Sequence, residues 1–365
     1  MTRPDAAREE RILVIGPSWV GDMVMAQSLF MALLERFPGA RIDVLAPGWS
    51  LPLLTRMPQV HAGIEMPLGH GEFGFALRWR IARALRREGY TRAVVLPGSW
   101  KSALIPFLAG IARRTGWRGE MRYGLLNDIR LLDKARLPMT VQRFVALAWP
   151  AHSEPPPVEP SAGEAAGGLP AAHPPRLNVD VANQERLRRD MGLATGRPVV
   201  AFMPGAEYGP AKQWPLPHFA RLASQLIAGG ATVWVLGSAR DYAAGQCIVE
   251  GLPAEHALNL CGRTRLEDAV DLLALCRAAV TNDSGLMHVA AALDLPLVAL
   301  FGSSSPEHTP PLSARARVLY LGLDCSPCFA RECPLGHTRC LAEISPARVL
   351  DTLENLGVFQ PEATA

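Results

Sequence analysis

The sequence is poor in the features that mark membrane-spanning, secreted and nucleic-acid-binding proteins. None of its apolar runs approaches the roughly 18 residues that a membrane-spanning helix needs. The amino terminus, MTRPDAAREE, carries both charge signs ahead of a short apolar run, which is not the pattern of a secretory signal. A net charge of +3 in 365 residues is too small to indicate nucleic acid. We therefore expect a cytoplasmic protein with no nucleic-acid partner.

Lysine is almost absent, because only positions 101, 134 and 212 carry it while the chain has 37 basic residues in all. A codon bias toward arginine is the simplest explanation. Lys212 nevertheless stands alone in the second half of the chain, inside a glycine-rich loop. This position makes it a candidate functional cation.

The pattern of apolar residues predicts an α/β protein of about two domains. Short apolar runs predict strands at 11–16, 41–46, 92–97, 198–203, 231–237, 278–282 and 296–301. Helical spacing predicts helices at 22–36, 76–88, 101–110, 216–229, 239–250, 266–277 and 284–293. Strands that alternate with helices favour parallel sheets covered on both faces.

Residues 153–175, SEPPPVEPSAGEAAGGLPAAHPP, interrupt this periodicity and read as a linker. They separate an expected domain at 1–175 from a second at 176–365. Ligands of doubly wound sheets bind beyond the carboxyl ends of the strands. We therefore expect two Rossmann-like halves with the site in an interdomain cleft.

The stretch ILVIGPSWVGDMV (12–24) leads from an apolar strand through a glycine loop into a helix, as phosphate-binding turns do. Gly16 and Gly21 imitate P-loop spacing, but Asp22 stands where that motif carries lysine, and G-x-G-x-x-G is missing. A carboxylate there would repel phosphate. Two interpretations stay open: Asp22 caps the helix, or it is a general base whose ionised form the helix dipole stabilises.

Two loops of the second half carry groups that would attract a phosphate. MPGAEYGPAKQWP (203–215) contains Lys212, which is either an exposed lysine or a cation for a diphosphate. In AAVTNDSGLMHVAAALDLPLVALFG (278–302), Asp283-Ser284-Gly285 opens a helix whose free N–H groups form an anion site. His288 follows one turn later on the same face. Alternatively, Ser284 only caps the helix and His288 is a packed surface histidine.

A base in one half and a diphosphate site in the other indicate glycosyl transfer by single displacement. An activated hydroxyl would attack a sugar carbon whose leaving group is a nucleoside diphosphate. Because a diphosphate leaves without being protonated when its charge is neutralised, no second carboxylate is required.

The sequence resembles the ADP-heptose:lipopolysaccharide heptosyltransferases, and specifically their heptosyltransferase II branch, up to about residue 320. The resemblance rests on ILVIGPSWVGDMVMAQSL, MPLGHG (66–71), KSALIPFLAGI (101–111), RTGWRGEMRYGLLND (114–128), PGAEYGPAKQWP and TNDSGLMHVAAAL. It implies a GT-B fold and an inverting transferase. The reaction implied moves L-glycero-D-manno-heptose from ADP-heptose to the first heptose of the lipopolysaccharide inner core.

The resemblance also implies roles for individual residues. Asp22 matches the catalytic base, Lys212 contacts donor phosphate, and Thr264 aligns with an adenine-side contact. No metal or other cofactor is implied for the transfer step, since Lys212 and the helix end would neutralise the diphosphate. The expected donor-binding residues are Ser18, Gly205, Lys212, Thr264, Asp283, Ser284, Gly285 and His288.

The implied acceptor, heptosyl-Kdo-lipid A, carries acidic sugars and lipid phosphates, and its lipid implies peripheral contact with the cytoplasmic face of the inner membrane. Three arginines of the segment 114–128 would form a cationic strip for it if the segment is helical or tightly turned. The expected acceptor-binding residues are Lys101, Arg114, Arg118 and Arg122.

A second basic set, Arg80, Arg83 and Arg87, falls on one face of the predicted 76–88 helix. This face would suit the acceptor or an anionic leaflet. A solvated helix face is the alternative interpretation.

The segment CSPCFARECPLGHTRC (325–340) concentrates four of the seven cysteines at C-x2-C-x4-C-x6-C spacing. Cys325, Cys328, Cys333 and Cys340 could bind a structural zinc ion tetrahedrally, although the spacing is not a common one. A reducing cytoplasm disfavours disulfides, so free or redox-labile thiols are the alternative. Nothing in the segment suggests catalysis.

Other functions stay open. A heptosyltransferase acting on a neighbouring core sugar would have the same motifs. A nucleotide-sugar epimerase on the same fold needs acid and base on both faces of one sugar, and only one well-placed carboxylate is evident. A non-catalytic nucleotide-sugar sensor or assembly scaffold predicts that Asp22→Ala leaves the cellular phenotype intact.

Overall fold

The computed structural model describes residues 10–69, 72–151, 173–194 and 196–359. The predicted linker at 153–175 lies almost wholly outside these ranges. The chain divides into unit 1 (Met1–Pro174) and unit 2 (Pro175–Ala365), one residue from the predicted boundary. Among the described residues, the structure contains no helix with the length and apolarity needed to span a bilayer.

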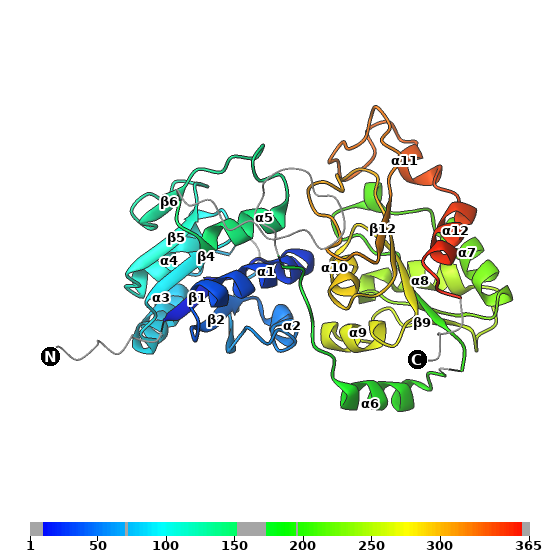
Figure 1. Cartoon of the computed structure of the whole chain (residues 1–365), viewed down its shortest axis with the longest axis horizontal. Helices are drawn as coiled ribbons and strands as arrows, with labels where there is room; N and C mark the ends of the chain where they lie inside the picture. The colour runs from blue at the N-terminus through cyan, green and yellow to red at the C-terminus, as the bar shows by residue number, and fades with distance from the viewer. Residues whose placement is uncertain (1–9, 70–71, 152–172, 195, 360–365) are drawn as a thin grey trace. The chain divides into compact units, whose positions relative to one another are not determined.

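Unit 1 is built on a parallel six-stranded sheet in the order β3-β2-β1-β4-β5-β6. Its strands are β1 (Arg11–Ile15), β2 (Arg41–Ala46), β3 (Ala62–Glu65), β4 (Arg92–Val95), β5 (Arg113–Trp117) and β6 (Asp128–Arg130). Its helices are α1 (Val20–Arg36), α2 (Leu51–Leu54), α3 (Phe75–Leu85), α4 (Trp100–Leu108) and α5 (Thr140–Val145), with short 3₁₀ turns η1 (Gly48–Ser50), η2 (Arg86–Glu88) and η3 (Ala146–Ala148). Within the unit α1 packs beside α5, and α3 packs beside α4 (Figure 1).

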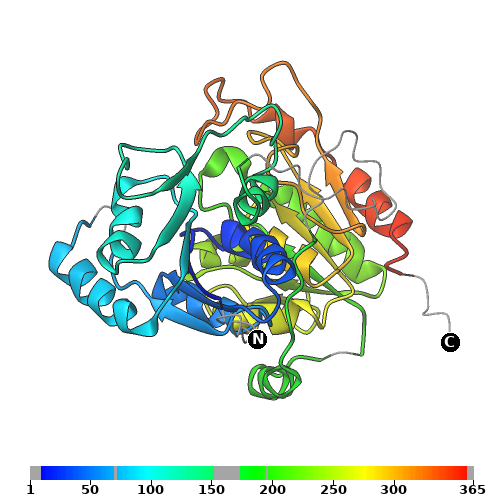
Figure 2. The same ribbon diagram turned by 60° about the vertical axis from the view of Figure 1, so that its left-hand side comes forward.

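Unit 2 repeats the plan with the sheet order β12-β11-β10-β7-β8-β9. Its strands are β7 (Val199–Met203), β8 (Thr232–Val235), β9 (Ala257–Asn259), β10 (Ala278–Asn282), β11 (Leu297–Leu300) and β12 (Ala316–Leu319). Its helices are α6 (Val181–Met191), α7 (Leu216–Ala228), α8 (Tyr242–Val249), α9 (Leu266–Leu273), α10 (Gly285–Ala292), α11 (Arg339–Ala342) and α12 (Pro346–Asn355), with 3₁₀ turns η4 (Pro210–Lys212) and η5 (Ala239–Asp241). The carboxyl-terminal helix α12 packs beside α7 (Figure 1 and Figure 2).

Each sheet reads 3-2-1-4-5-6 when its strands are numbered within their own unit, which is the strand order of a Rossmann fold. The two predicted Rossmann-like halves are therefore confirmed. The order reverses between β1 and β4 in unit 1 and between β7 and β10 in unit 2. Ligands of such sheets bind beyond the strand ends at this reversal, so the loops that follow these four strands are the places to examine.

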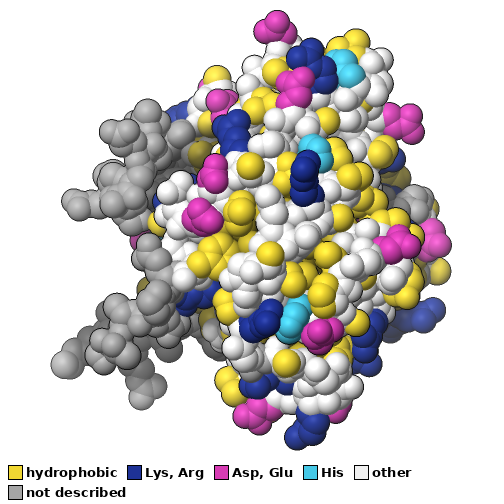
Figure 3. Space-filling view, turned by 90° about the vertical axis from the view of Figure 1, so that its right-hand side faces the viewer, with side chains coloured by type: hydrophobic (Ala, Val, Ile, Leu, Met, Phe, Trp, Pro, Cys, Tyr) yellow, Lys and Arg dark blue, Asp and Glu magenta, His cyan; other side chains and the backbone are white. Residues whose placement is uncertain are grey.

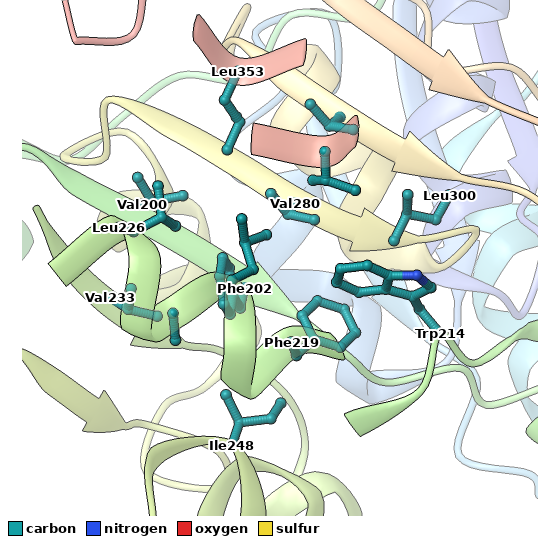
Figure 4. Packing of buried hydrophobic residues seen from close by; sticks show 14 of the residues in the cluster. Val200, Phe202, Trp214, Phe219, Leu226, Val233, Ile248, Val280, Leu300 and Leu353 are labelled. Carbon is teal, nitrogen blue, oxygen red and sulfur yellow. The ribbon is translucent and has the colours of Figure 1, made fainter. Parts of the chain in front are cut away.

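The core of unit 2 reaches directly to one of these loops. Trp214 and Phe219 pack edge to face with ring centroids 4.8 Å apart, and Phe202 of β7 lies 5.4 Å from Phe219 (Figure 4). The Trp214 side chain is completely buried, and its indole N–H donates to the carbonyl of Ile344 at 2.9 Å. The end of the predicted Lys212 loop is thus anchored in the hydrophobic core.

Basic and acidic side chains are interspersed on the face shown in Figure 3, with apolar side chains between them. This mixture is what a small net charge predicts for a solvated surface.

Candidate functional site

Asp22 lies in the first turn of α1, directly beyond the carboxyl end of β1. The helix begins at Val20 with Trp19 as its N-cap residue, so Asp22 is the third helical residue and is half-buried. The predicted start at residue 22 was two residues late, and the interpretation of Asp22 as the N-cap is wrong. The carboxylate therefore stands in the first turn, at the positive end of the helix dipole.

The turn into α1 depends on Gly16, which is buried at the end of β1. A Cβ atom at this position would come within 2.8 Å of the Met23 methyl carbon and 3.2 Å of a Val44 methyl carbon. The absent side chain lets the helix start close against the sheet. The glycine thus sets where Asp22 stands relative to the strand ends.

In unit 2 the loop that carries Lys212 is held at both ends by one side chain. Asn282, the last residue of β10, is fully buried. Its Oδ1 accepts from the backbone N–H of Trp214 at 3.0 Å, and its Nδ2 donates to the carbonyl of Pro204 at 2.6 Å. Sequence reasoning missed Asn282, because nothing in the pattern distinguishes it from an ordinary turn residue.

Replacing Asn282 with alanine is expected to lower the free energy of unfolding by about 2–4 kcal/mol, because two buried backbone groups lose their partner. Asn259 is the matched control: it also bonds two backbone groups, Tyr242 O at 3.0 Å and Cys261 N at 3.1 Å, but is only half-buried. Urea unfolding should give a clearly smaller loss for Asn259→Ala. Equal losses would show that Asn282 has no special role in holding the loop.

Lys212 points at the end of β10. Its ammonium Nζ lies 2.5 Å from Oδ2 of Asp283 and 5.2 Å from the centre of the Tyr208 ring. The side chains of Lys212 and Asp283 are 18% and 7% exposed, so the pair is largely shielded from water. The Asp283 carboxylate therefore fixes the direction of the ammonium, which has three N–H donors and can offer those that remain to an anion.

Helix α10 starts immediately after Asp283 with Ser284 in the N-cap position. Ser284 makes no side-chain capping bond within the described structure, and its hydroxyl lies 3.4 Å from that of Thr281. Ser284 therefore occupies the N-cap position, as the capping interpretation predicts, but within the described part of the chain its hydroxyl does not accept a capping hydrogen bond. The first N–H groups of α10, including that of Gly285, are oriented as a helix terminus offers them to an anion.

His288 is 5% exposed, so the expectation of a surface histidine is wrong. Burial lowers the pKa of His288 from 6.5 to about 4; Asp283 opposes this shift and Lys212 adds to it. The imidazole is therefore neutral at physiological pH, a buried uncharged group near enough to Lys212 and Asp283 for both charges to act on its pKa.

Acidification is expected to destabilise the fold through His288. Between pH 6.5 and about 4 the unfolded chain binds a proton at this residue that the folded chain does not, so stability falls as the pH falls. At pH 5 the expected loss is about 2 kcal/mol. Urea unfolding at pH 7 and pH 5 should show a smaller pH dependence for His288→Gln than for the unmodified chain. An identical dependence in both would contradict a neutral buried imidazole.

The other predicted donor residues lie on neighbouring loops. Gly205 follows β7, and a Cβ there would come within 2.7 Å of Oδ1 of Asp241. Thr264 lies half-buried in the loop before α9. Ser18, also half-buried, belongs to unit 1 and shares the loop of Asp22. The structure thus brings together Lys212, Asp283, Ser284 and His288, and places Gly205 and Thr264 at the same edge of the sheet.

Two further serines at this edge were missed. Ser303 and Ser304 follow β11 and are 1% and 6% exposed. Neither hydroxyl has a hydrogen-bond partner among the described residues. The sequence signal, a Gly-Ser-Ser-Ser run after a predicted strand, was available but carries no specific chemistry.

Comparison with known proteins identifies the family of the chain. Residues 78–339 match glycosyltransferase family 9 (heptosyltransferase). The chain belongs to this family. It is 51% identical to lipopolysaccharide heptosyltransferase 2 of Salmonella typhimurium, over 95% of this chain and 98% of that protein. It is 50% identical to lipopolysaccharide heptosyltransferase 2 of Escherichia coli K12, over 97% of this chain and all of that protein.

The fold comparison agrees. The solved structure of E. coli ADP-heptose LPS heptosyltransferase II superposes with a TM-score of 0.83 at 48% identity, covering 97% of this chain and 100% of that one. The GT-B fold expected from the sequence is confirmed, and so is the expectation of a glycosyltransferase.

The expectation that the arginines of segment 114–128 form a cationic strip is wrong. The segment starts as strand β5 and continues as turns, so its arginines do not share a surface. Arg122 is 1% exposed and donates to the carbonyls of Pro97 and Trp117. Its buried guanidinium joins the loops after β4 and β5 and is not available to an acceptor.

Arg114 is also used within the protein. Its guanidinium donates to the carbonyls of Leu125, at 2.6 Å, and Ile111, and lies over the Phe107 ring. Burial lowers the pKa of Arg114, which still leaves the group charged. Of the predicted acceptor residues, exposed Arg118 and half-buried Lys101 stay available.

The cysteine-rich segment packs against the Lys212 loop. The Tyr208 hydroxyl donates to the carbonyl of Phe329 at 2.7 Å, and the N–H of Ala211 donates to that of Arg331 at 3.0 Å. A Cβ on Gly209 would come within 2.4 Å of the Arg331 carbonyl oxygen. The cysteine-rich segment therefore supports the backbone of the loop that carries Lys212, although its sequence gives no sign of a role in catalysis.

The expected zinc set is not formed by the cysteines of this segment. No three His, Cys, Asp or Glu side chains are grouped as a metal site within the described residues, and the structure has free thiols at Cys325, Cys328, Cys333 and Cys340. Backbone N–H groups, first that of Thr338, lower the pKa of the Cys333 thiol, whereas burial raises that of Cys340.

Proposed function

We propose that this glycosyltransferase moves L-glycero-D-manno-heptose from ADP-heptose to the first heptose of the lipopolysaccharide inner core, with inversion at the anomeric carbon. The observation that carries the proposal is the Lys212–Asp283 pair beside the start of α10, a diphosphate-binding arrangement at the strand-order reversal of unit 2. Full-length relatives at about half identity are named for lipopolysaccharide heptosyl transfer, which supports the substrate class.

In the proposed reaction Asp22 is the general base. As the acceptor hydroxyl oxygen forms its bond to the anomeric carbon, its proton passes to the Asp22 carboxylate. The bond from the anomeric carbon to the diphosphate oxygen breaks, and ADP leaves with the electron pair. The Lys212 ammonium and the N–H groups at Ser284 and Gly285 stabilise the charge that develops there.

The remaining donor residues have supporting roles in this proposal. Asp283 orients Lys212, buried neutral His288 supports the turn, and Thr264 contacts the adenine side. Gly205 gives the backbone close access to the ligand, and Ser18 approaches it from the Asp22 loop. The transfer step uses no metal or other cofactor in this mechanism.

Acceptor binding belongs to unit 1 in the same proposal. Lys101 and Arg118 contact the acidic groups of heptosyl-Kdo-lipid A, while Arg114 and Arg122 only shape the loops around them. The enzyme acts in the cytoplasm, in peripheral contact with the inner membrane, and takes no nucleic acid.

Mass spectrometry of the product tests this function. ADP-heptose and a defined mono-heptosylated core acceptor are expected to give ADP and an acceptor larger by one heptose. A donor isomerised in the absence of acceptor would indicate an epimerase. Transfer only to an acceptor that lacks heptose, or already carries two, would move the enzyme to a neighbouring step.

A further inference from the structure

Unit 1 exposes a group of large aromatic side chains around α3. Phe73, Phe75, Trp79 and Trp100 are 43%, 51%, 51% and 40% exposed. Ring centroids of Phe73 and Phe75 lie 6.0 Å apart, and those of Phe73 and Trp100 lie 5.2 Å apart. Trp79 follows Phe75 by one helical turn and is its neighbour on the helix surface. These four residues form a continuous aromatic patch. Single exposed apolar residues are common on protein surfaces, but a contiguous patch indicates an interaction site.

The aromatic patch is held in place from beneath. Arg78 is 5% exposed; its Nε donates to the carbonyl of Phe73 at 2.7 Å, and its Nη1 donates to that of Lys101 at 3.1 Å. The chain enters α3 through Gly74 at a φ of +50°, where a side chain would run into Leu68. The rings are therefore presented to solvent by a fixed backbone.

Basic side chains continue from the aromatic patch along α3 and into the 3₁₀ turn η2 that follows it. Residues 72–88 contain five arginines and two glutamates. The buried Arg78 is one of the five, and the other four are exposed, with no ion pair among the described residues that involves them. We call these four the basic stretch: Arg80, Arg83, Arg86 and Arg87.

The aromatic patch also lies next to the catalytic edge of unit 1. Phe73 follows β3 and Trp100 follows β4, while Asp22 follows β1. Parallel strands end at one edge of a sheet, so these loops share that edge. Trp19, after β1, and Trp49, after β2, add exposed rings at 46% and 45%.

We propose that the aromatic patch and the basic stretch together form a docking surface for an anionic lipid bilayer, with the rings at headgroup level and the arginines on phosphates. The proposal rests on the proposed function insofar as the acceptor is lipid-linked. Aromatic rings and arginines on one exposed helix are the features that hold interfacial helices at membranes. Their positive charge complements anionic headgroups. Docking here presents the Asp22 edge to an acceptor anchored in the same bilayer.

Vesicle sedimentation with the full-length chain tests whether this surface binds lipid. The vesicles contain phosphatidylcholine alone or an equal mixture of phosphatidylcholine and phosphatidylglycerol. The unmodified enzyme is expected to prefer the anionic vesicles. Each arginine contributes roughly fivefold, so the triple variant Arg80→Gln, Arg83→Gln, Arg87→Gln should bind them on the order of a hundredfold more weakly. The double variant Phe75→Ser, Trp79→Ser should lose on the order of tenfold.

Matched controls come from exposed positions of unit 2. The triple variant Arg189→Gln, Arg221→Gln, Arg348→Gln removes the same charge from α6, α7 and α12, and Tyr242→Ser removes a ring that is 52% exposed. Both should bind anionic vesicles as the unmodified enzyme does. Equal losses in test and control variants would overturn the proposal, as would unmodified enzyme that ignores anionic lipid.

Turnover with a deacylated, lipid-free acceptor separates this proposal from the proposed function. The docking variants should keep their kcat and KM for that acceptor while losing activity on the same acceptor in vesicles. A raised KM for the lipid-free acceptor would assign the surface to the glycan and overturn the docking proposal. No transfer by the unmodified enzyme to either acceptor would instead contradict the proposed function, with vesicle binding still measured independently.

Discussion

Replacing Asp22 with asparagine is expected to lower kcat by about 10²–10⁴-fold, the usual contribution of a positioned general base. The substitution keeps the size of the side chain but removes the group that accepts the hydroxyl proton. Because Asp22 belongs to unit 1 and the Lys212 loop belongs to unit 2, the affinity for ADP should not change. Steady-state kinetics with ADP-heptose and a mono-heptosylated acceptor measures the effect.

Asp351→Asn is the matched control, because Asp351 is an exposed helical aspartate on α12. Its kcat should equal that of the unmodified enzyme. An Asp22→Asn enzyme that retains more than about a tenth of the activity would not be missing its base, since even a weak general base contributes about a hundredfold. The helix-terminal carboxylate would then be structural.

Replacing Lys212 with alanine is expected to weaken ADP binding by roughly 10- to 150-fold, the value of one charge-assisted hydrogen bond. The same change should lower kcat, because the ammonium also stabilises charge on the departing diphosphate. It leaves the buried Asp283 carboxylate without its 2.5 Å partner, so the free energy of unfolding should fall as well. Calorimetric titration with ADP and urea unfolding measure the two effects separately.

The double variant Lys212→Ala, Asp283→Asn distinguishes ligand binding from folding. It removes the unpaired charge, so stability should recover in part while ADP affinity stays low. Lys134→Ala, at an exposed lysine of unit 1, should change neither quantity. Recovery of ADP affinity in the double variant would mean that Lys212 acts only by neutralising Asp283.

The Rossmann-like plan was predictable because its central strands are continuous apolar runs. Strand β10 (Ala278–Asn282) occupies the predicted residues, and β7 begins one residue later than predicted. The pattern of apolar residues did not predict elements that are only partly buried. Strand β5, with the sequence RRTGW, has little apolar character, and α6, with the sequence VANQERLRRDM, buries only Leu187. Periodicity identifies elements through the face they bury, so such elements leave little signal.

The candidate site was predictable as far as local motifs extend. The Lys212 loop and the Asp283–His288 turn lie at one edge because their strands β7 and β10 are neighbours. Contacts between distant segments were not accessible to this reasoning. The clamp of Asn282 on Pro204 and the hydrogen bond from Tyr208 to Phe329 join residues 78 and 121 positions apart. The prediction for Arg122 failed because its burial depends on Pro97, in the loop after the neighbouring strand β4, as well as on Trp117 of β5.

Calorimetric titration of ADP into Asp22→Asn and Lys212→Ala tests the central claim most directly, that unit 1 supplies the base and unit 2 binds the leaving group. The account predicts that Asp22→Asn binds ADP with a Kd like that of the unmodified enzyme, whereas Lys212→Ala binds it at least about tenfold more weakly. Equal loss of ADP affinity in the two variants would contradict this division of labour.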